Sequence, residues 1–218
     1  LLPRALLLED SERGNPTLSP DGTRIAYSAQ VDGVQNLWVK TVGQDDDRAV
    51  TGEKENGIDY CFWRADSRHV LYFKDQAGDE NTHLFQTDVE TGESRDLTPV
   101  KGARARALIM DAVHPDELLI HLNARDERFF DVHRLDLRSG ALRLDTENPW
   151  DVTQFDADPD LRVRAALAVH RDNSVEVRVR SQEIETAVTA SRSLASGTVA
   201  LRAESEPFSK ARNVETPQ

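Results

Sequence analysis

The chain of 218 residues contains one cysteine, one methionine and no long apolar run. Because Cys61 is alone, no disulfide can form within the chain, which suits a reducing compartment. It lies in the apolar stretch "YCFW", so we expect it to be a small buried hydrophobe. The longest apolar run near the start, 5–8, is far too short to span a bilayer. No signal-peptide pattern is visible either, so we expect a cytoplasmic protein without a membrane partner.

Basic residues are also in short supply. The chain has 27 Lys and Arg against 39 Asp and Glu, which gives a formal net charge of −12. A surface of this sign repels phosphate backbones. The composition therefore excludes nucleic acid as an expected partner.

The sequence lacks the motifs of a hydrolase active site. No G-x-S-x-G pentapeptide occurs, although a nucleophile elbow requires it to lift its serine clear of a sheet. Ser94 and Ser139 lie in stretches typical of hairpin turns. The Asp and His of a triad would have to follow the serine in chain order, and the chain has no room for that arrangement. We assign no catalytic residue.

Metal-binding spacings are absent as well, and no H-E-x-x-H or paired C-x-x-C occurs. The six histidines are scattered: His69, His83, His114, His121, His133 and His170. We interpret His114 and His121, seven residues apart, as ordinary polar positions. The acidic stretches 45–47 and 156–160 lack the glycine and distant glutamate of an EF-hand loop, so we expect solvated turns. Neither a metal site nor a cofactor is predicted.

What the sequence does contain is an internal repeat, which begins at "LSPDGTRIAY" (18–27). Similar apolar segments recur at offsets of 45, 48 and 45 residues: 24–30, 69–75, 117–123 and 162–169. A second strand-like segment follows each of them after a short turn: 36–42, 83–89, 131–137 and 175–180. Turn-forming residues separate the two segments of each pair. This pattern predicts consecutive antiparallel hairpins.

The repeat length indicates the fold class. A unit of about 45 residues with roughly four strands matches the blade of a β-propeller. "HVLYFK" (69–74) is apolar at four successive positions, which predicts a strand covered on both faces. "VEVRVR" (175–180) alternates, which predicts one buried face. A β-sandwich also uses short strands, but it does not require similar segments at this spacing. We predict an all-β fold, a partial propeller of about four blades.

The predicted organisation is a lead-in segment over 1–14 and an incomplete propeller over 15–180. Pro20, Asp21 and Gly22 would make the tight turn before the first strand. Residues 67–69 and 115–117 are weakened copies of that turn. The four blades would cover about 15–56, 57–101, 102–149 and 150–180.

The composition changes over 181–218, which is rich in Ser, Ala and Thr and has a single aromatic residue, Phe208. Low hydrophobicity of this kind is often disordered. A weak helical pattern is present over 184–201. We expect a poorly ordered or weakly helical tail. One hypothesis is that the reading frame shifts near 172–181, so that the tail is not native propeller sequence.

With the repeat laid out, the chain resembles the N-terminal propeller of prolyl oligopeptidase family serine peptidases, in the acylaminoacyl-peptidase-like branch. The resemblance rests on 1–27, 36–42, 114–142 and especially 60–99, where a "GDEN" turn precedes "HLF" and "DVETGESRDLTP". It covers about 1–180. It implies a propeller of about seven blades over an α/β-hydrolase domain. The propeller's central channel would admit short peptides to the active site and exclude folded proteins.

Four repeats account for 15–180, and the remaining 38 residues are too few for three more blades or a hydrolase domain. We therefore expect a substrate-gating fragment of a serine peptidase, not catalytic by itself and truncated before the catalytic domain. Its partners would be the parent's peptide substrate and the missing α/β-hydrolase domain. The alternatives are a non-catalytic TolB-like propeller that binds a protein partner, and an unstable product without function.

Two groups of residues could contact a ligand in such a fragment. Arg104 and Arg106, in "KGARARAL", either face the channel and meet a substrate carboxylate or lie in a solvent-facing loop. The aromatic cluster could form a ligand platform, but packing between blades is the more common role of aromatics at strand spacing. It comprises Tyr60, Phe62, Trp63, Tyr72 and Phe73.

Overall fold

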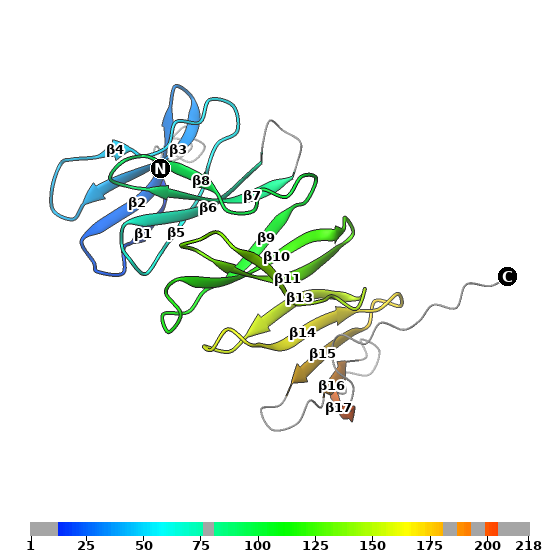
Figure 1. Ribbon diagram of the computed structural model, residues 1–218. Coiled ribbons are helices and arrows are strands. Elements are labelled where there is room, and N and C mark those ends of the chain that lie inside the picture. The colour runs from blue at the N-terminus through cyan, green and yellow to red at the C-terminus, as the bar shows by residue number, and fades with distance from the viewer. Residues whose placement is uncertain (1–12, 76–80, 181–186, 193–198, 205–218) are drawn as a thin grey trace, which may run out of the picture. The chain divides into compact units, whose positions relative to one another are not determined.

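The structure is a computed structural model that describes residues 13–75, 81–180, 187–192 and 199–204, the last two ranges as backbone only. The chain divides into two compact units, Leu1–Pro99 and Val100–Gln218. Each unit holds two antiparallel sheets (Figure 1), and each is described by itself. The described residues contain strands and turns but no helix.

The first unit contains two four-stranded sheets in which neighbours in the chain are neighbours in the sheet. The strands of the first sheet are β1 (Arg13–Leu18), β2 (Arg24–Val31), β3 (Val34–Thr41) and β4 (Arg48–Ala49). Those of the second are β5 (Phe62–Trp63), β6 (His69–Asp75), β7 (Thr82–Asp88) and β8 (Ser94–Asp96). This simple up-and-down order is that of a propeller blade.

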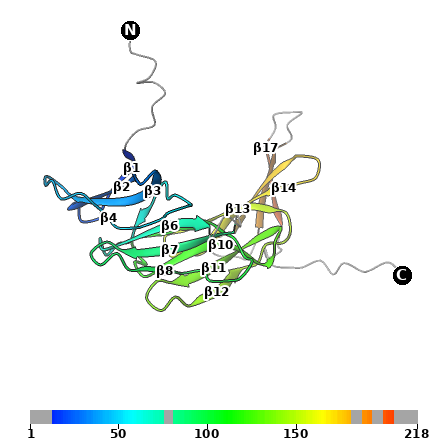
Figure 2. The same ribbon diagram turned by 90° about the horizontal axis from the view of Figure 1, so that it is seen from above.

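The second unit repeats the arrangement, and β10 and β11 run side by side in both ribbon views (Figure 1 and Figure 2). Its first sheet consists of β9 (Ala105–Ile109), β10 (Glu117–Asp126), β11 (Phe129–Asp136) and β12 (Leu142–Thr146). Its second consists of β13 (Val152–Ala157), β14 (Val163–Val169), β15 (Val175–Arg180), β16 (Ala187–Arg192) and β17 (Val199–Glu204). The fold is therefore all-β, with four blades of propeller type.

The turn before β2 explains why the motif "SPDG" opens the repeat. Ser19 N–H donates to the Arg24 carbonyl at 2.8 Å, and Gly22 N–H donates to the Ser19 carbonyl at 2.8 Å. The carboxylate of Asp21 accepts the Ser19 hydroxyl at 2.6 Å and the Thr23 N–H at 3.0 Å. Gly22 has φ +73°, a conformation that glycine adopts without strain.

The second sheet repeats this turn with a serine in the glycine position. Ser67 N–H donates to the Arg64 carbonyl at 3.1 Å, and Ser67 has φ +55°. Its hydroxyl also accepts the N–H of Asp21 at 3.1 Å. The turns of the two sheets in the first unit are therefore bonded to one another.

The fourth sheet holds a copy of the turn that sequence reasoning missed. Leu161 N–H donates to the Asp158 carbonyl at 2.8 Å, and Leu161 has φ +55°. The acidic stretch 156–160 thus leads into β14 through a turn, as expected. Leu161 is fully buried, however, and its carbonyl accepts a hydrogen bond from Arg134 of β11.

In each unit the two sheets share an apolar core. The core of the first unit consists of Ala26, Leu37, Val39, Val50, Ile58, Cys61, Trp63, Val70, Tyr72, Phe85 and Val89. That of the second consists of Leu119, Val132, Val152, Phe155, Leu161, Val163, Ala166 and Ala168. Burial of these side chains between sheets provides the main favourable term for folding. Cys61 is buried as expected.

The four predicted main strands are confirmed as β2, β6, β10 and β14. Val70, Leu71 and Tyr72 are all fully buried, so β6 is covered on both faces as predicted. The expectation for β15 was wrong: Val177 and Val179 are 37% and 38% exposed. Val177 lines a shallow hollow with Phe155 and Leu167, whereas Arg178 on the opposite face is bonded to Asp151.

The weak helix expected over 184–201 is also wrong for the part that the structure describes. Ala187–Arg192 pairs with Val175–Arg180, and Val199–Glu204 pairs with Ala187–Arg192, both antiparallel. The β-branched residues Val188 and Thr189 favour a strand over a helix. The rest of 181–218, like the lead-in 1–12 and most of the "GDEN" turn (76–80), lies outside the described residues, so the disorder and the frame shift stay predictions.

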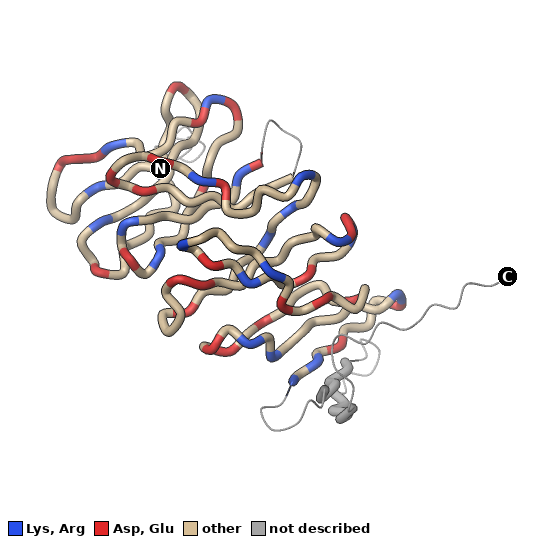
Figure 3. Tube along the Cα trace, viewed as in Figure 1, with Lys and Arg blue, Asp and Glu red and all other residues tan. Residues whose placement is uncertain are grey.

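Charged residues of both signs are distributed over the surface of each unit. Figure 3 shows acidic and basic positions interspersed along the trace of both. Among the described residues no helix is long and apolar enough to cross a membrane.

Candidate functional site

The histidines are distributed over the sheets. His69, His83 and His170 each contact a nearby carboxylate, at 2.8, 2.7 and 3.1 Å. His121 is only 2% exposed, so it is a buried polar side chain within its sheet. Within the ranges that the structure describes, no three His, Cys, Asp or Glu side chains lie close enough to hold a metal ion.

The two serines of the hairpin stretches have structural partners. The hydroxyl of Ser94 lies 2.7 Å from that of Thr87, whose own hydroxyl lies 3.0 Å from Tyr72. The hydroxyl of Ser139 donates to Asp136 at 2.8 Å within a turn. Both hydroxyls therefore contribute to local hydrogen bonding at a strand or turn.

The aromatic cluster divides into packing and surface members. Trp63 and Tyr72 belong to the core of the first unit, and the Tyr72 ring stacks on Phe85 with centroids 5.9 Å apart. Tyr60 is 51% exposed and meets Phe62 edge-on at 5.8 Å. Packing between sheets, the role we favoured, is confirmed for Trp63 and Tyr72.

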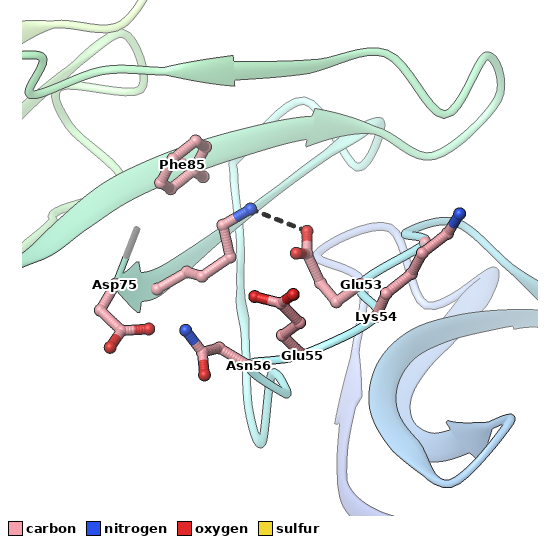
Figure 4. Close-up of a pocket in the computed structure, with 8 residues that line it drawn as sticks. Glu53, Lys54, Glu55, Asn56, Asp75 and Phe85 are labelled. Atoms are coloured by element: carbon pink, nitrogen blue, oxygen red, sulfur yellow. Dashed lines mark hydrogen bonds and ion pairs between the residues drawn. The ribbon is translucent and has the colours of Figure 1, made fainter. Parts of the chain in front are cut away.

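A hollow of about 450 Å³ lies in the first unit beside β6 and β7 (Figure 4). Its lining is mostly polar: Gly52, Glu53, Lys54, Glu55, Asn56, Lys74, Asp75 and Phe85. Lys74 Nζ lies 2.8 Å from Glu53 and 4.6 Å from the centre of the Phe85 ring. Figure 4 shows Lys54 directed away from this pair. The Lys74 cation is therefore already matched by a carboxylate and is not available to a bound anion.

A second candidate lies in the second unit, where two guanidinium groups share one aromatic ring. The guanidinium carbon of Arg106 lies 3.8 Å from the centre of the Phe130 ring, and that of Arg104 lies 5.3 Å from it. Phe130 is 4% exposed, whereas both arginines are exposed. The ring therefore forms a buried base beneath two charged groups that face solvent, a favourable cation–π arrangement.

A backbone irregularity lies beside this arginine pair. The pairing register of β9 with β10 shifts between Ile120 and Leu122 of β10. Ala107 has φ +39°, an uncommon conformation for a residue with a Cβ. Bulges often re-aim side chains at functional sites, and left-handed non-glycine residues are concentrated there. The backbone around Arg106 thus departs from the geometry of a regular edge strand.

Neighbouring groups hold the two arginines in place. The backbone of Arg104 is bonded to Asn123, whose side-chain oxygen accepts the Arg104 N–H and whose own backbone N–H donates to the Arg104 carbonyl. The guanidinium of Arg106 donates to the Thr153 carbonyl at 2.8 Å. One arginine is therefore fixed through its backbone and the other through its side chain.

No described carboxylate balances the charge of this arginine pair. Neither Arg104 nor Arg106 forms a salt bridge with a described carboxylate, although Arg125, Arg134 and Arg178 of the same unit do. Burial and the like charge of Arg104 lower the pKa of Arg106. Two uncompensated positive charges thus lie together on a chain with an excess of acid.

His121, a buried residue of β10, lies close enough to Arg106 to be affected by its charge. Its ring meets Phe155 edge-on with centroids 5.8 Å apart, and its Nε2 has no hydrogen-bond partner among the described residues. Burial and then the charge of Arg106 lower the pKa of His121 to about 4. The imidazole is therefore neutral near pH 7 and adds no further positive charge.

Sequence reasoning missed an exposed aromatic surface around Trp150. This residue is 45% exposed and has φ +79°, which is an outlier for a bulky side chain. Arg125 lies 4.4 Å from its ring, and Phe129 meets it edge-on at 5.0 Å. The side-chain oxygen of Asn148 accepts the backbone N–H of Trp150 at 3.0 Å and holds the strained backbone in place. Exposed Trp and Arg are frequent in protein interfaces.

Comparisons with known proteins show what the chain as a whole is similar to. No protein-family model matches the chain. It is 34% identical over 178 residues to dipeptidyl aminopeptidase BIII of Pseudoxanthomonas mexicana, a match that covers 81% of this chain and 26% of that protein. The chain therefore spans about a quarter of the length of this curated relative.

Solved structures support the fold. A structure from a study of two prolyl endopeptidases matches with a TM-score of 0.55 at 13% identity, covering 88% of this chain and 35% of that one. A candidate TolB protein from Agrobacterium tumefaciens matches with a TM-score of 0.51 at 13% identity, covering 89% of this chain and 68% of that one. At these identities the likeness concerns the fold alone.

Proposed function

Because this chain belongs to the prolyl oligopeptidase family, we propose that it is a propeller segment that controls access to a serine peptidase active site. The peptidase would act on short peptides. The observation that carries this proposal is the 34% identity to a dipeptidyl aminopeptidase over 81% of the chain. The acylaminoacyl-peptidase-like branch that the sequence resembles is part of the proposal.

The role of the segment is physical rather than chemical. Sheets packed face to face through apolar cores form a stiff wall, and such a wall can exclude folded proteins while extended peptides pass. Nucleophilic catalysis would come from a Ser–Asp–His triad in an α/β-hydrolase domain outside these 218 residues. The peptide substrate and that domain would be the segment's partners, in the cytoplasm, and no cofactor would be needed.

The first test is the DNA sequence of the gene from codon 170 through the next ~1.5 kilobases, a span set by three further blades and a hydrolase domain. It should be read in all three frames. We expect further blades and a G-x-S-x-G motif. If neither occurs in any frame, the peptidase proposal is wrong.

A second test uses the complete gene product that contains this segment. We expect it to hydrolyse a dipeptide anilide and a short peptide, but not a folded protein that carries the same cleavable sequence in an exposed loop. Equal rates on the peptide and the folded protein would contradict a gating role.

A second candidate function is a non-catalytic, TolB-like propeller that binds a protein partner. The fold likeness to the candidate TolB protein and the exposed, strained Trp150 favour it. A tight one-to-one complex with another protein, lost in Trp150→Ala and retained in Trp38→Ala, would support it. A gene that continues into a hydrolase domain would count against it.

A further inference from the structure

We propose that Arg104 and Arg106 form a binding site for a carboxylate, and that its ligand is the free carboxylate of a short peptide. The proposal depends on the proposed function for the peptide nature of the ligand. The site itself is argued from the second unit alone.

The first argument is unbalanced charge. The two guanidinium groups lie 5.3 and 3.8 Å from the centre of one ring, that of Phe130. Their like charges repel one another, and no described carboxylate forms a salt bridge with either. A bound anion would remove that repulsion, so the arrangement is more stable occupied than empty.

The contrast within the same unit sharpens this argument. Arg125 lies 2.8 Å from Asp131, Arg134 lies 3.1 Å from Glu117, and Arg178 is bonded to Asp151. A chain with 39 acidic and 27 basic residues can supply a carboxylate to most arginines. It supplies none to Arg104 and Arg106, which share one aromatic ring, so both charges remain available to a ligand.

The second argument is the number of free donors. A guanidinium carries five N–H groups in a rigid fork. Arg106 uses one nitrogen for the Thr153 carbonyl, and Arg104 is anchored through its backbone N–H and carbonyl rather than through its guanidinium. Donors therefore remain on both side chains, and a carboxylate accepts them in pairs through its two oxygens.

The third argument is prior organisation. Phe130 is 4% exposed and gives both guanidinium groups a fixed base. Ala107, next to Arg106, is held at φ +39° beside the register shift between β9 and β10. A side chain already held in position loses less freedom when it binds. The strained backbone of Ala107 thus lies directly beside the arginine that it helps to position.

Phosphate would satisfy the same donors, so the source of the anion must be distinguished. The chain's net charge of −12 disfavours a dianion or a polyanion more than a singly charged carboxylate. A peptide also offers backbone N–H and carbonyl groups for hydrogen bonds beside the carboxylate, which phosphate does not. We therefore assign the site to a peptide carboxylate.

The experiment titrates the full 218-residue chain with N-acetyl-trialanine and with its C-terminal amide, followed by two-dimensional NMR of backbone and arginine side-chain N–H groups. We expect saturable shifts at Arg104 and Arg106 with the acid, and affinity for the amide lower by about tenfold or more, the usual effect of losing a charge-assisted hydrogen bond. N-acetyl-Ala-Glu-Ala amide distinguishes a side-chain carboxylate from a terminal one. Inorganic phosphate is titrated in parallel.

The matched variants are Arg106→Gln and Arg143→Gln. Arg143 is exposed on β12, the opposite edge of the same sheet, so the control removes the same charge elsewhere. We expect Arg106→Gln to abolish the preference for the acid and Arg143→Gln to retain it. Should Arg106→Gln lose its fold by circular dichroism, Arg104→Gln and competition by phosphate on the unaltered chain give the same information.

Each outcome decides a separate point. Equal binding of acid and amide overturns the arginine site while leaving peptide recognition by the segment intact. Binding of phosphate without binding of either acidic peptide overturns the peptide ligand. An absence of binding by every anion overturns the site altogether. None of these results depends on the downstream hydrolase domain, so failure of the site and failure of the peptidase proposal remain distinguishable.

Discussion

The indole Nε1 of Trp63 donates a hydrogen bond to the backbone carbonyl of Thr17 at 3.1 Å. Trp63 belongs to β5 of the second sheet and Thr17 to β1 of the first, so a single side chain joins one edge strand of each sheet in the first unit. In the second unit Arg106 makes a corresponding link from β9 to the Thr153 carbonyl of β13, at 2.8 Å. Each unit is therefore held together by polar bonds as well as by its apolar core.

Trp63→Phe removes this link while keeping most of the buried apolar surface. We expect the free energy of unfolding to fall by about 1–3 kcal/mol, because the carbonyl loses its donor in a partly buried place. Chemical denaturation followed by circular dichroism measures it. Trp38→Phe is the matched control, since its indole bonds to Ala29 within one sheet. An equal loss of unfolding free energy in both variants would show that the bond between the sheets stabilises the unit no more than a bond within one sheet.

Gly22→Ala tests the backbone conformation of the turn before β2. No atom lies within 4 Å of the added Cβ, but φ is +73°, so we expect a loss of about 1 kcal/mol from strain alone. Gly52→Ala also meets no atom within 4 Å and has no left-handed φ. It should be neutral or slightly stabilising. Equal thermal midpoints for the two variants would contradict this reasoning.

Asp131→Ala tests the buried network at the start of β11. The carboxylate is fully buried and accepts the N–H of Asn148 at 2.7 Å and two bonds from Arg125. Its removal leaves those donors without a partner, and we expect a loss of about 3–5 kcal/mol. Asp126→Ala removes the partner of the exposed Arg128 and should lower the unfolding midpoint far less. Urea titration of both variants measures the difference.

His121 should make the protein sensitive to acid. Its pKa is about 4 in the folded chain and near 6.5 when unfolded, so between these values the unfolded state binds more protons. Stability is therefore complete above about pH 6.5 and falls as the pH drops towards 4, by up to about 3 kcal/mol. His121→Phe should flatten this dependence between pH 6.5 and 4. An unchanged slope in His121→Phe would contradict this assignment.

The thiol of Cys61 should report on the unfolding of the first unit. Burial raises its pKa to about 12, so almost no thiolate exists at about pH 8, and only the thiolate reacts. We expect iodoacetamide to label the native chain very slowly and the urea-unfolded chain rapidly. Fast labelling without urea would mean that the core around Cys61 opens readily.

The main strands could be predicted because they carry their own signal. Each of them is an apolar segment that recurs along the chain, so the local pattern alone locates them: β2, β6, β10 and β14. The edge strands β1, β5, β9 and β13 were not predicted individually. β5 has two residues, and β9 contains a register shift, so neither shows the alternation of apolar and polar residues that marks a strand.

The functional features depended on contacts that no local pattern reveals. Arg104 and Arg106 could be named from the sequence, but whether they met a ligand or lay in a loop stayed open. Their common base, Phe130, comes from β11, two strands away in the sheet order. The surface around Trp150 was missed because its strained backbone depends on Asn148 and its ring on Arg125.

The turn at Leu161 has a consequence for rearranging this protein by design. The same turn is written with glycine in the first sheet, serine in the second and leucine in the fourth, so a local rule does not set the residue. Leu161 keeps its left-handed conformation while its side chain fills the core and its carbonyl binds Arg134 of the preceding sheet. The conformation of this turn in the fourth sheet therefore depends on a side chain of the third. Chimeras that exchange the two as a pair should fold more readily than chimeras that exchange either one alone.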